Sequence, residues 1–190
     1  MSKGVGLALT IRWAPGGKTS LADITYLDPG DLADADHRRV IDYWVGLKGE
    51  AFAPSWADWD WMRLPMKLIP YFVVADVLRE PLDFRYRFYG SGHVAIYGRD
   101  YTGCLISEIQ PANIATASLR QYAEVLEKRK PIVCLHTVDI EGVRVARDQV
   151  SIRMPMSSNG TDIDIIASFA DYRRAQEDMK EAFSRAREAG

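Results

Sequence analysis

Residues 83–109 read DFRYRFYGSGHVAIYGRDYTGCLISEI. The beginning of this stretch alternates, so a strand over 84–89 would turn its aromatic residues at 84, 86 and 88 to one sheet face and Arg85, Arg87 and Tyr89 to the other. Gly90 ends the strand, Ser91 can cap a short helix, and Gly98 can take the left-handed conformation that ends it. A strand that leads into short helices predicts a cup, in which a sheet forms the floor and helices form the walls around a ligand.

Helical and extended patterns alternate along the rest of the chain. Apolar residues at three- and four-residue steps predict a helix over 36–48, capped by Asp34 or Asp36. A nearly continuous apolar run predicts a central strand over 71–77, and Asn113 can cap an amphipathic helix. The remaining expected strands lie at 132–140, 144–156 and 163–170.

This order of elements predicts an α+β fold. We expect a five-stranded antiparallel sheet with helices on one face, plus N-terminal and C-terminal flanking helices. The expected regions are an N-terminal extension over 1–35, a domain over 36–172 that includes its N-terminal helix, and a C-terminal amphipathic helix over 173–190. Within the extension, the apolar pieces 7–11 and 24–27 could pair as a hairpin or run extended.

Composition narrows the classes of function. A net charge of −2 gives no electrostatic reason to expect nucleic acid or an anionic membrane as a partner. No apolar run approaches the length that spans a bilayer. Cys104 and Cys134 fit neither a disulfide framework nor the spacing of a metal site, so we expect a cytoplasmic protein without a bound metal.

Three motifs resemble a PAS-domain family that is common in alphaproteobacteria, in which one sensor domain makes up most of a short protein. They are RYRFYGS at 85–91, YGRDYTG at 97–103, and Leu64-Pro65 followed by Leu68-Ile69-Pro70. The resemblance covers about residues 36–172. It implies a sensory or signalling domain and transfers no catalytic residue.

We expect a ligand pocket between the concave face of the sheet and the helices of residues 91–126. Strand alternation gives it a mainly apolar lining without a cluster of cations, which suits a neutral or singly charged molecule. The alternative is a core in which the same side chains interdigitate and leave no cavity. The expected lining residues are Tyr86, Phe88, His93, Tyr97, Tyr122, Cys134, His136, Ile152, Met154 and Phe169.

The sequence identifies no cofactor, and it argues against haem and flavin in particular. No histidine has a second ligand at helical metal-site spacing, and Cys104 lacks the Asn-Cys-Arg signature of flavin photosensors of this fold, so neither haem nor flavin is predicted. We therefore expect no enzyme, although a small enzyme with His93 or His136 as base remains an alternative, for which a carboxylate beside that histidine would be required.

The sequence thus predicts a sensory or regulatory domain that binds a small, largely apolar ligand or a partner protein. We expect no effector domain, and we therefore expect the signal to pass through the flanking helices to a separate signalling protein or by self-association. A homodimer is predicted through one face of the 36–48 helix, formed by Val40, Tyr43, Trp44 and Leu47. A ligand-free structural dimerisation module is a further alternative.

Overall fold

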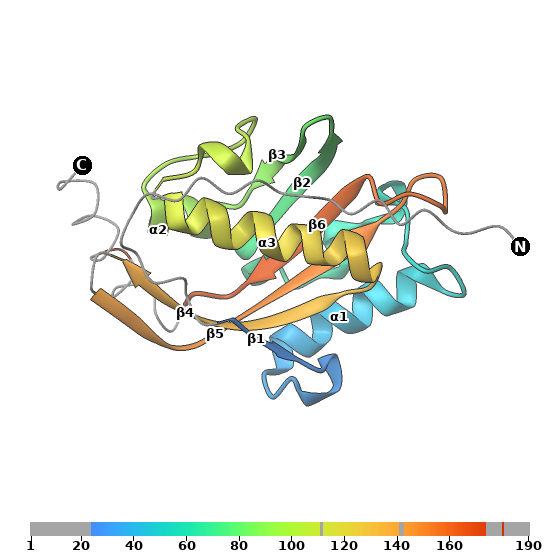
Figure 1. The fold of residues 1–190 in the computed structure, drawn as a ribbon. Coiled ribbons are helices and arrows are strands. Elements are labelled where there is room, and N and C mark those ends of the chain that lie inside the picture. The colour runs from blue at the N-terminus through green and yellow to red at the C-terminus, as the bar shows by residue number, and fades with distance from the viewer. Residues whose placement is uncertain (1–23, 111, 141–142, 174–179, 181–190) are drawn as a thin grey trace, which may run out of the picture.

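The computed structural model describes residues 24–110, 112–140, 143–173 and 180. Among them, six strands form one antiparallel sheet in the order β1-β4-β5-β6-β2-β3 (Figure 1). The strands are β1 Ile24–Leu27, β2 Phe72–Arg79, β3 Leu82–Tyr89, β4 Ile132–Ile140, β5 Val143–Met156 and β6 Ile165–Ala170. The helices are α1 Ala35–Lys48, α2 Ser91–Tyr97 and α3 Ala112–Lys128. These elements confirm the α+β class.

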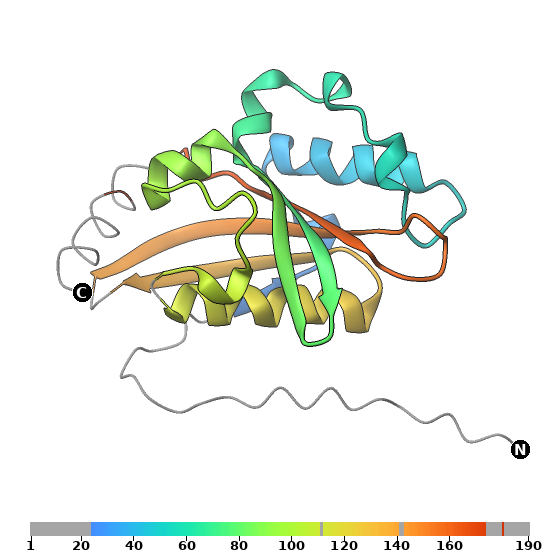
Figure 2. The same cartoon turned by 90° about the horizontal axis from the view of Figure 1, so that it is seen from above.

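Helices cover both faces of the sheet, because α1, which was expected as a flanking helix, lies on the face opposite α3 (Figure 2). Figure 2 shows α1 and the segment that follows it on one side of the sheet and α3 on the other. A sheet with two covered faces requires apolar residues on both sides of its central strands. Strand β6 meets this requirement, because all of its residues are buried.

The sheet also has one strand more than expected. The predicted strand at 24–27 exists as β1, and it pairs with β4, where Ile24 lies opposite His136. The other half of the possible hairpin, 7–11, lies outside the described residues, as does most of the expected C-terminal helix.

Helix α1 begins where the sequence predicts. The Asp34 side chain caps it by accepting hydrogen bonds from the backbone amides of Asp36 and His37. Its buried face includes Val40 and Trp44, which are 0% and 2% exposed. The Trp44 indole donates a hydrogen bond of 2.9 Å to the backbone oxygen of Pro155 in β5. The helix is therefore fixed to the sheet of its own chain.

This placement corrects the predicted dimer interface. Val40 and Trp44 lie inside the domain, while Tyr43 and Leu47 are partly buried and pack against the same core. The Tyr43 hydroxyl is also engaged, since it donates to the backbone oxygen of Asp60 at 3.0 Å. The face that we expected to meet a second copy meets β5 and the tryptophan-rich turns instead.

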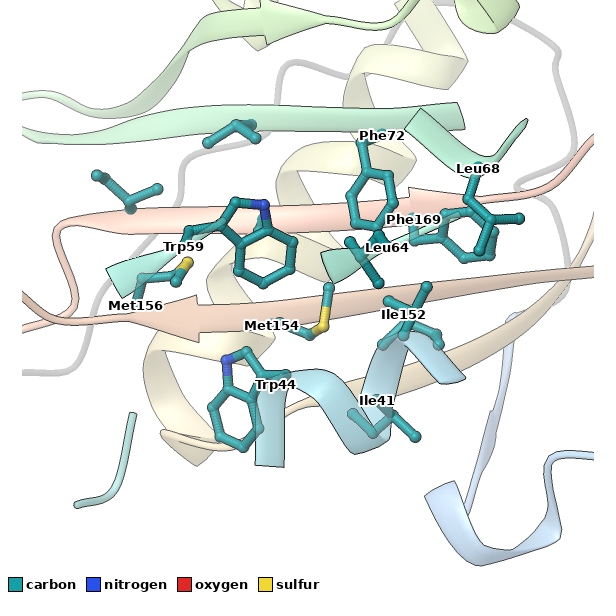
Figure 3. Packing of buried hydrophobic residues seen from close by; sticks show 14 of the residues in the cluster. Ile41, Trp44, Trp59, Leu64, Leu68, Phe72, Ile152, Met154, Met156 and Phe169 are labelled. Atoms are coloured by element: carbon teal, nitrogen blue, oxygen red, sulfur yellow. The ribbon is translucent and has the colours of Figure 1, made fainter. Parts of the chain in front are cut away.

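Short 3₁₀ turns complete this layer. They are η2 Trp56–Asp58, η3 Trp61–Arg63 and η4 Met66–Tyr71, and Asp60 caps η3 through the amide of Met62. Figure 3 shows Trp59, Leu64 and Phe72 packed with Trp44, Met154 and Phe169 in one core between these turns, α1 and the sheet. We call this cluster the α1-side core.

A β-bulge reverses the side-chain alternation of β3. Val74 pairs with Phe88 and Ala75 pairs with Tyr86, so Arg87 has no partner residue in β2. Consequently Tyr86 and Tyr89 lie on the α3 side, whereas Phe88 turns to the α1-side core and packs against Trp61. Arg87 stays at the surface and forms an ion pair with Asp76.

Candidate functional site

A cavity lies on the α3 side of the sheet, near the point where β3 passes into α2. Its empty volume is about 320 Å³, including the part that is open to solvent, and the enclosed space has room for about one water molecule. We call it the tyrosine cavity, because four of its lining residues are tyrosines. It is lined by Val73, Tyr86, Tyr89, His93, Tyr97, Ile109, Ile114, Ser118, Arg153 and Tyr172.

Tight backbone packing holds α2 at the edge of this cavity. A side chain at Gly90 would come within 2.2 Å of the backbone oxygen of Pro70, so only glycine fits there. At the other end of the helix, Gly98 adopts the left-handed conformation with φ of 68°, as the sequence predicts. The short helix therefore presents His93 and Tyr97 to the cavity at defined positions.

Arg153 supplies the charge of the cavity. This residue of β5 is only 8% exposed. Its Nε donates a hydrogen bond of 2.9 Å to Oε1 of Gln121, and its guanidinium carbon lies 4.8 Å from the centre of the Tyr122 ring. Both contacting residues come from α3, so the arginine is clamped between the sheet and this helix.

The other titratable groups of the cavity are neutral at physiological pH. Burial raises the pKa of Tyr86, Tyr89 and Tyr97 well above its ordinary value, so their hydroxyls stay protonated. Burial lowers the pKa of His93 to about 4, and its Nε2 lies 3.1 Å from the backbone oxygen of Tyr71. His93 is therefore a neutral ring that donates to a carbonyl.

The structure brings some of the predicted pocket residues together. Tyr86, His93 and Tyr97 line the cavity, and Tyr122 lies beside it, where it contacts Arg153 and accepts a hydrogen bond from Ser168. Cys134 is buried in the same hydrophobic cluster but does not line the cavity.

Four predicted lining residues face the wrong way. Phe88, Ile152, Met154 and Phe169 belong to the α1-side core on the opposite face of the sheet. The bulge at Arg87 accounts for Phe88, and the register of β5 and β6 turns Ile152, Met154 and Phe169 toward α1 rather than α3. His136 lies in β4, where its pairing is defined, and its side chain is outside the described ones.

Seven of the ten residues that line the cavity were not predicted from the sequence, among them Arg153, Tyr89 and Tyr172. Arg153 stands in the alternating run Ser151-Ile152-Arg153-Met154, where a polar residue is expected to face solvent. Tyr89 was assigned to the outer face, because no signal marked the bulge. Tyr172 follows the last strand, and nothing in its neighbours predicts that it turns back into the cavity.

The contacts of His37 give it a structural role rather than a catalytic one. Nδ1 of His37 lies 3.0 Å from the Asp34 carboxylate, and Nε2 lies 3.2 Å from the backbone oxygen of Val150, so this buried ring joins the start of α1 to β5. Over the described residues, no group of three or more histidine, cysteine or acidic side chains is arranged to hold a metal ion. Likewise, none of the helices in the described part of the chain has the length and apolar character to cross a membrane.

Comparison of the chain with family models, curated proteins and solved structures finds no match. The function is therefore argued from the cavity and its connections.

Proposed function

We propose that this protein is a sensory or regulatory domain of PAS type that binds a small molecule in the tyrosine cavity. The order of elements supports the proposal, since a two-stranded hairpin, helices and a three-stranded meander follow one another along the chain. The observation that carries it is the cavity itself, to which the sheet, α2, α3 and Tyr172 all contribute side chains. Cavities at such a junction are the usual place for a small ligand.

The cavity is connected to both flanking segments. Tyr172 lines it, and the next residue, Arg173, bonds the Asp36 carboxylate at the start of α1 at 2.9 Å. Lys67 reaches the same carboxylate at 2.8 Å. Ion pairs at the surface are weak, so a ligand that moves Tyr172 could break this contact at little cost. A separate signalling protein or a second copy of the chain would then bind in a way that depends on the position of the segment after Tyr172.

The surroundings of His93 favour binding over catalysis. A histidine base of the kind considered above needs a carboxylate beside its ring and a pKa near neutrality. In the part of the chain that the structure describes, the hydrogen bond assigned to the His93 ring goes to a backbone carbonyl, and its pKa is depressed to about 4 by burial. We therefore prefer the sensor to the enzyme with a histidine base.

The test is to denature the purified full-length protein and identify the released small molecules by mass spectrometry. Ser118 of α3 lines the cavity, so Ser118→Phe should block it, whereas Thr116→Phe on the same helix serves as the matched control. We expect a molecule to be released from the wild type and the control but not from Ser118→Phe, with unchanged circular dichroism in all three. Release from Ser118→Phe at the wild-type level would refute the proposed site.

A further inference from the structure

A buried positive charge without a matching negative charge distinguishes the tyrosine cavity. Arg153 is only 8% exposed, and no ion pair links it to a carboxylate among the described residues. Burying a charge costs free energy unless a partner of opposite charge compensates for it, so a buried arginine is normally found with such a partner.

The protein neighbours of Arg153 do not provide that compensation. Gln121 offers a neutral amide oxygen to Nε, and Tyr122 offers the face of its ring. Burial opposes the charged form, but an arginine guanidinium is charged at neutral pH. The groups that raise the pKa of Arg153 above its ordinary value are Tyr122, Cys134, Tyr172 and Tyr86, and they do so only when they ionise. At neutral pH these groups are uncharged, so none of them is a counter-ion for Arg153.

The guanidinium is also positioned for a ligand. The hydrogen bond through Nε fixes its plane, and Arg153 is one of the residues that line the cavity. A guanidinium presents parallel N–H groups that match the two oxygens of a carboxylate. The hydroxyls of Tyr86 and Tyr89 in the same cavity are of the type that donates to such oxygens.

We propose that the tyrosine cavity binds a small organic monocarboxylate whose carboxylate group pairs with Arg153. The single positive charge of the cavity matches a ligand with a single negative charge. The aromatic rings of Tyr86, Tyr89 and Tyr97 would surround the apolar part of that ligand. The limited space favours acids with few carbon atoms. The inference rests on the proposed function, because it names the class of molecule that the same cavity recognises.

The experiment is calorimetric titration of the full-length protein at pH 7 with formate, acetate, propanoate and benzoate, each against its neutral amide. We expect at least one acid to bind roughly tenfold or more tightly than its amide, because a charge-assisted pair is lost in the amide. Arg153→Met should weaken the binding of that acid by a similar factor, and Arg153→Lys should weaken its binding less. Arg85→Met, which removes an exposed arginine from β3, should bind like the wild type.

Several results would overturn the inference. Equal binding of acid and amide, or undiminished acid binding by Arg153→Met, would show that the charge is not used. Equal binding of chloride or sulfate would show a general anion site. If Arg153→Met does not fold, the inference is tested by the affinity of Arg153→Lys for the acid and by the affinity of the wild type for the neutral amides. Release of a neutral molecule from the wild type but not from Ser118→Phe would refute the monocarboxylate while leaving the proposed function intact.

Discussion

Replacing Trp44 by alanine should destabilise the domain strongly and independently of protein concentration. The indole is 2% exposed and packs in the α1-side core, so its removal leaves a large cavity. Such substitutions cost about 3–5 kcal/mol, and the lost hydrogen bond to Pro155 adds to that cost. We expect a loss of about 4 kcal/mol, which is a large part of the stability of a domain of this size.

Urea denaturation followed by circular dichroism at two protein concentrations measures this loss. Val45 on the same helix is 49% exposed, so Val45→Ala is the matched control and should change stability by less than about 0.5 kcal/mol. If Trp44→Ala leaves no folded protein, Trp44→Phe should show the same direction with a smaller loss. A midpoint that rises with protein concentration in the wild type and not in the variant would refute the reasoning, because it would place Trp44 between two copies.

Three further predictions concern the positions that hold the site. Gly90→Ala should lower the melting temperature by several degrees or prevent folding, because its methyl group would meet the Pro70 carbonyl; an unchanged melting curve would show that α2 can move away. Asp34→Ala should cost about 1 kcal/mol at pH 7. Burial alone would raise the pKa of Asp34, but hydrogen bonds from His37 and the helix amides lower it to about 2. The stability that Asp34 contributes is therefore present above about pH 4 and is lost as the pH falls through 2. Near pH 2 the urea midpoints of the variant and the wild type should converge. Burial lowers the pKa of His93 to about 4, so protonation of this ring favours the unfolded chain. The free energy of unfolding of the wild type should fall by up to about 3 kcal/mol between pH 6.5 and 4. A His93→Asn variant that shows the same fall would contradict the lowered pKa of His93.

The elements of the fold could be predicted because each carries a local signal. Asp34 as a capping residue and Gly98 as a left-handed terminator mark helix ends through interactions within a few residues. The alternating and apolar runs likewise marked the strands. The order of elements followed from these signals alone.

The site could be predicted only in part, because it depends on which face of each strand meets which layer. The run around Arg153 shows clear alternation, but alternation does not say whether Met154 or Arg153 faces α3. The answer depends on α1, whose apolar face covers the other side of the sheet. The bulge at Arg87 is a single extra residue with no distinctive sequence, and it was enough to exchange Phe88 for Tyr89 in the cavity.

The position of β6 in the sheet has a consequence for the synthesis of the protein. Strand β2 pairs on one side with its neighbour β3 and on the other with β6, where Phe72 lies opposite Phe169. The hairpin can form as soon as both of its strands exist, whereas the centre of the sheet must wait for nearly the whole domain. During translation, the β2 edge of the β2–β3 hairpin therefore remains unpaired until β6 emerges, and in that interval its free backbone groups are exposed to pairing with other chains.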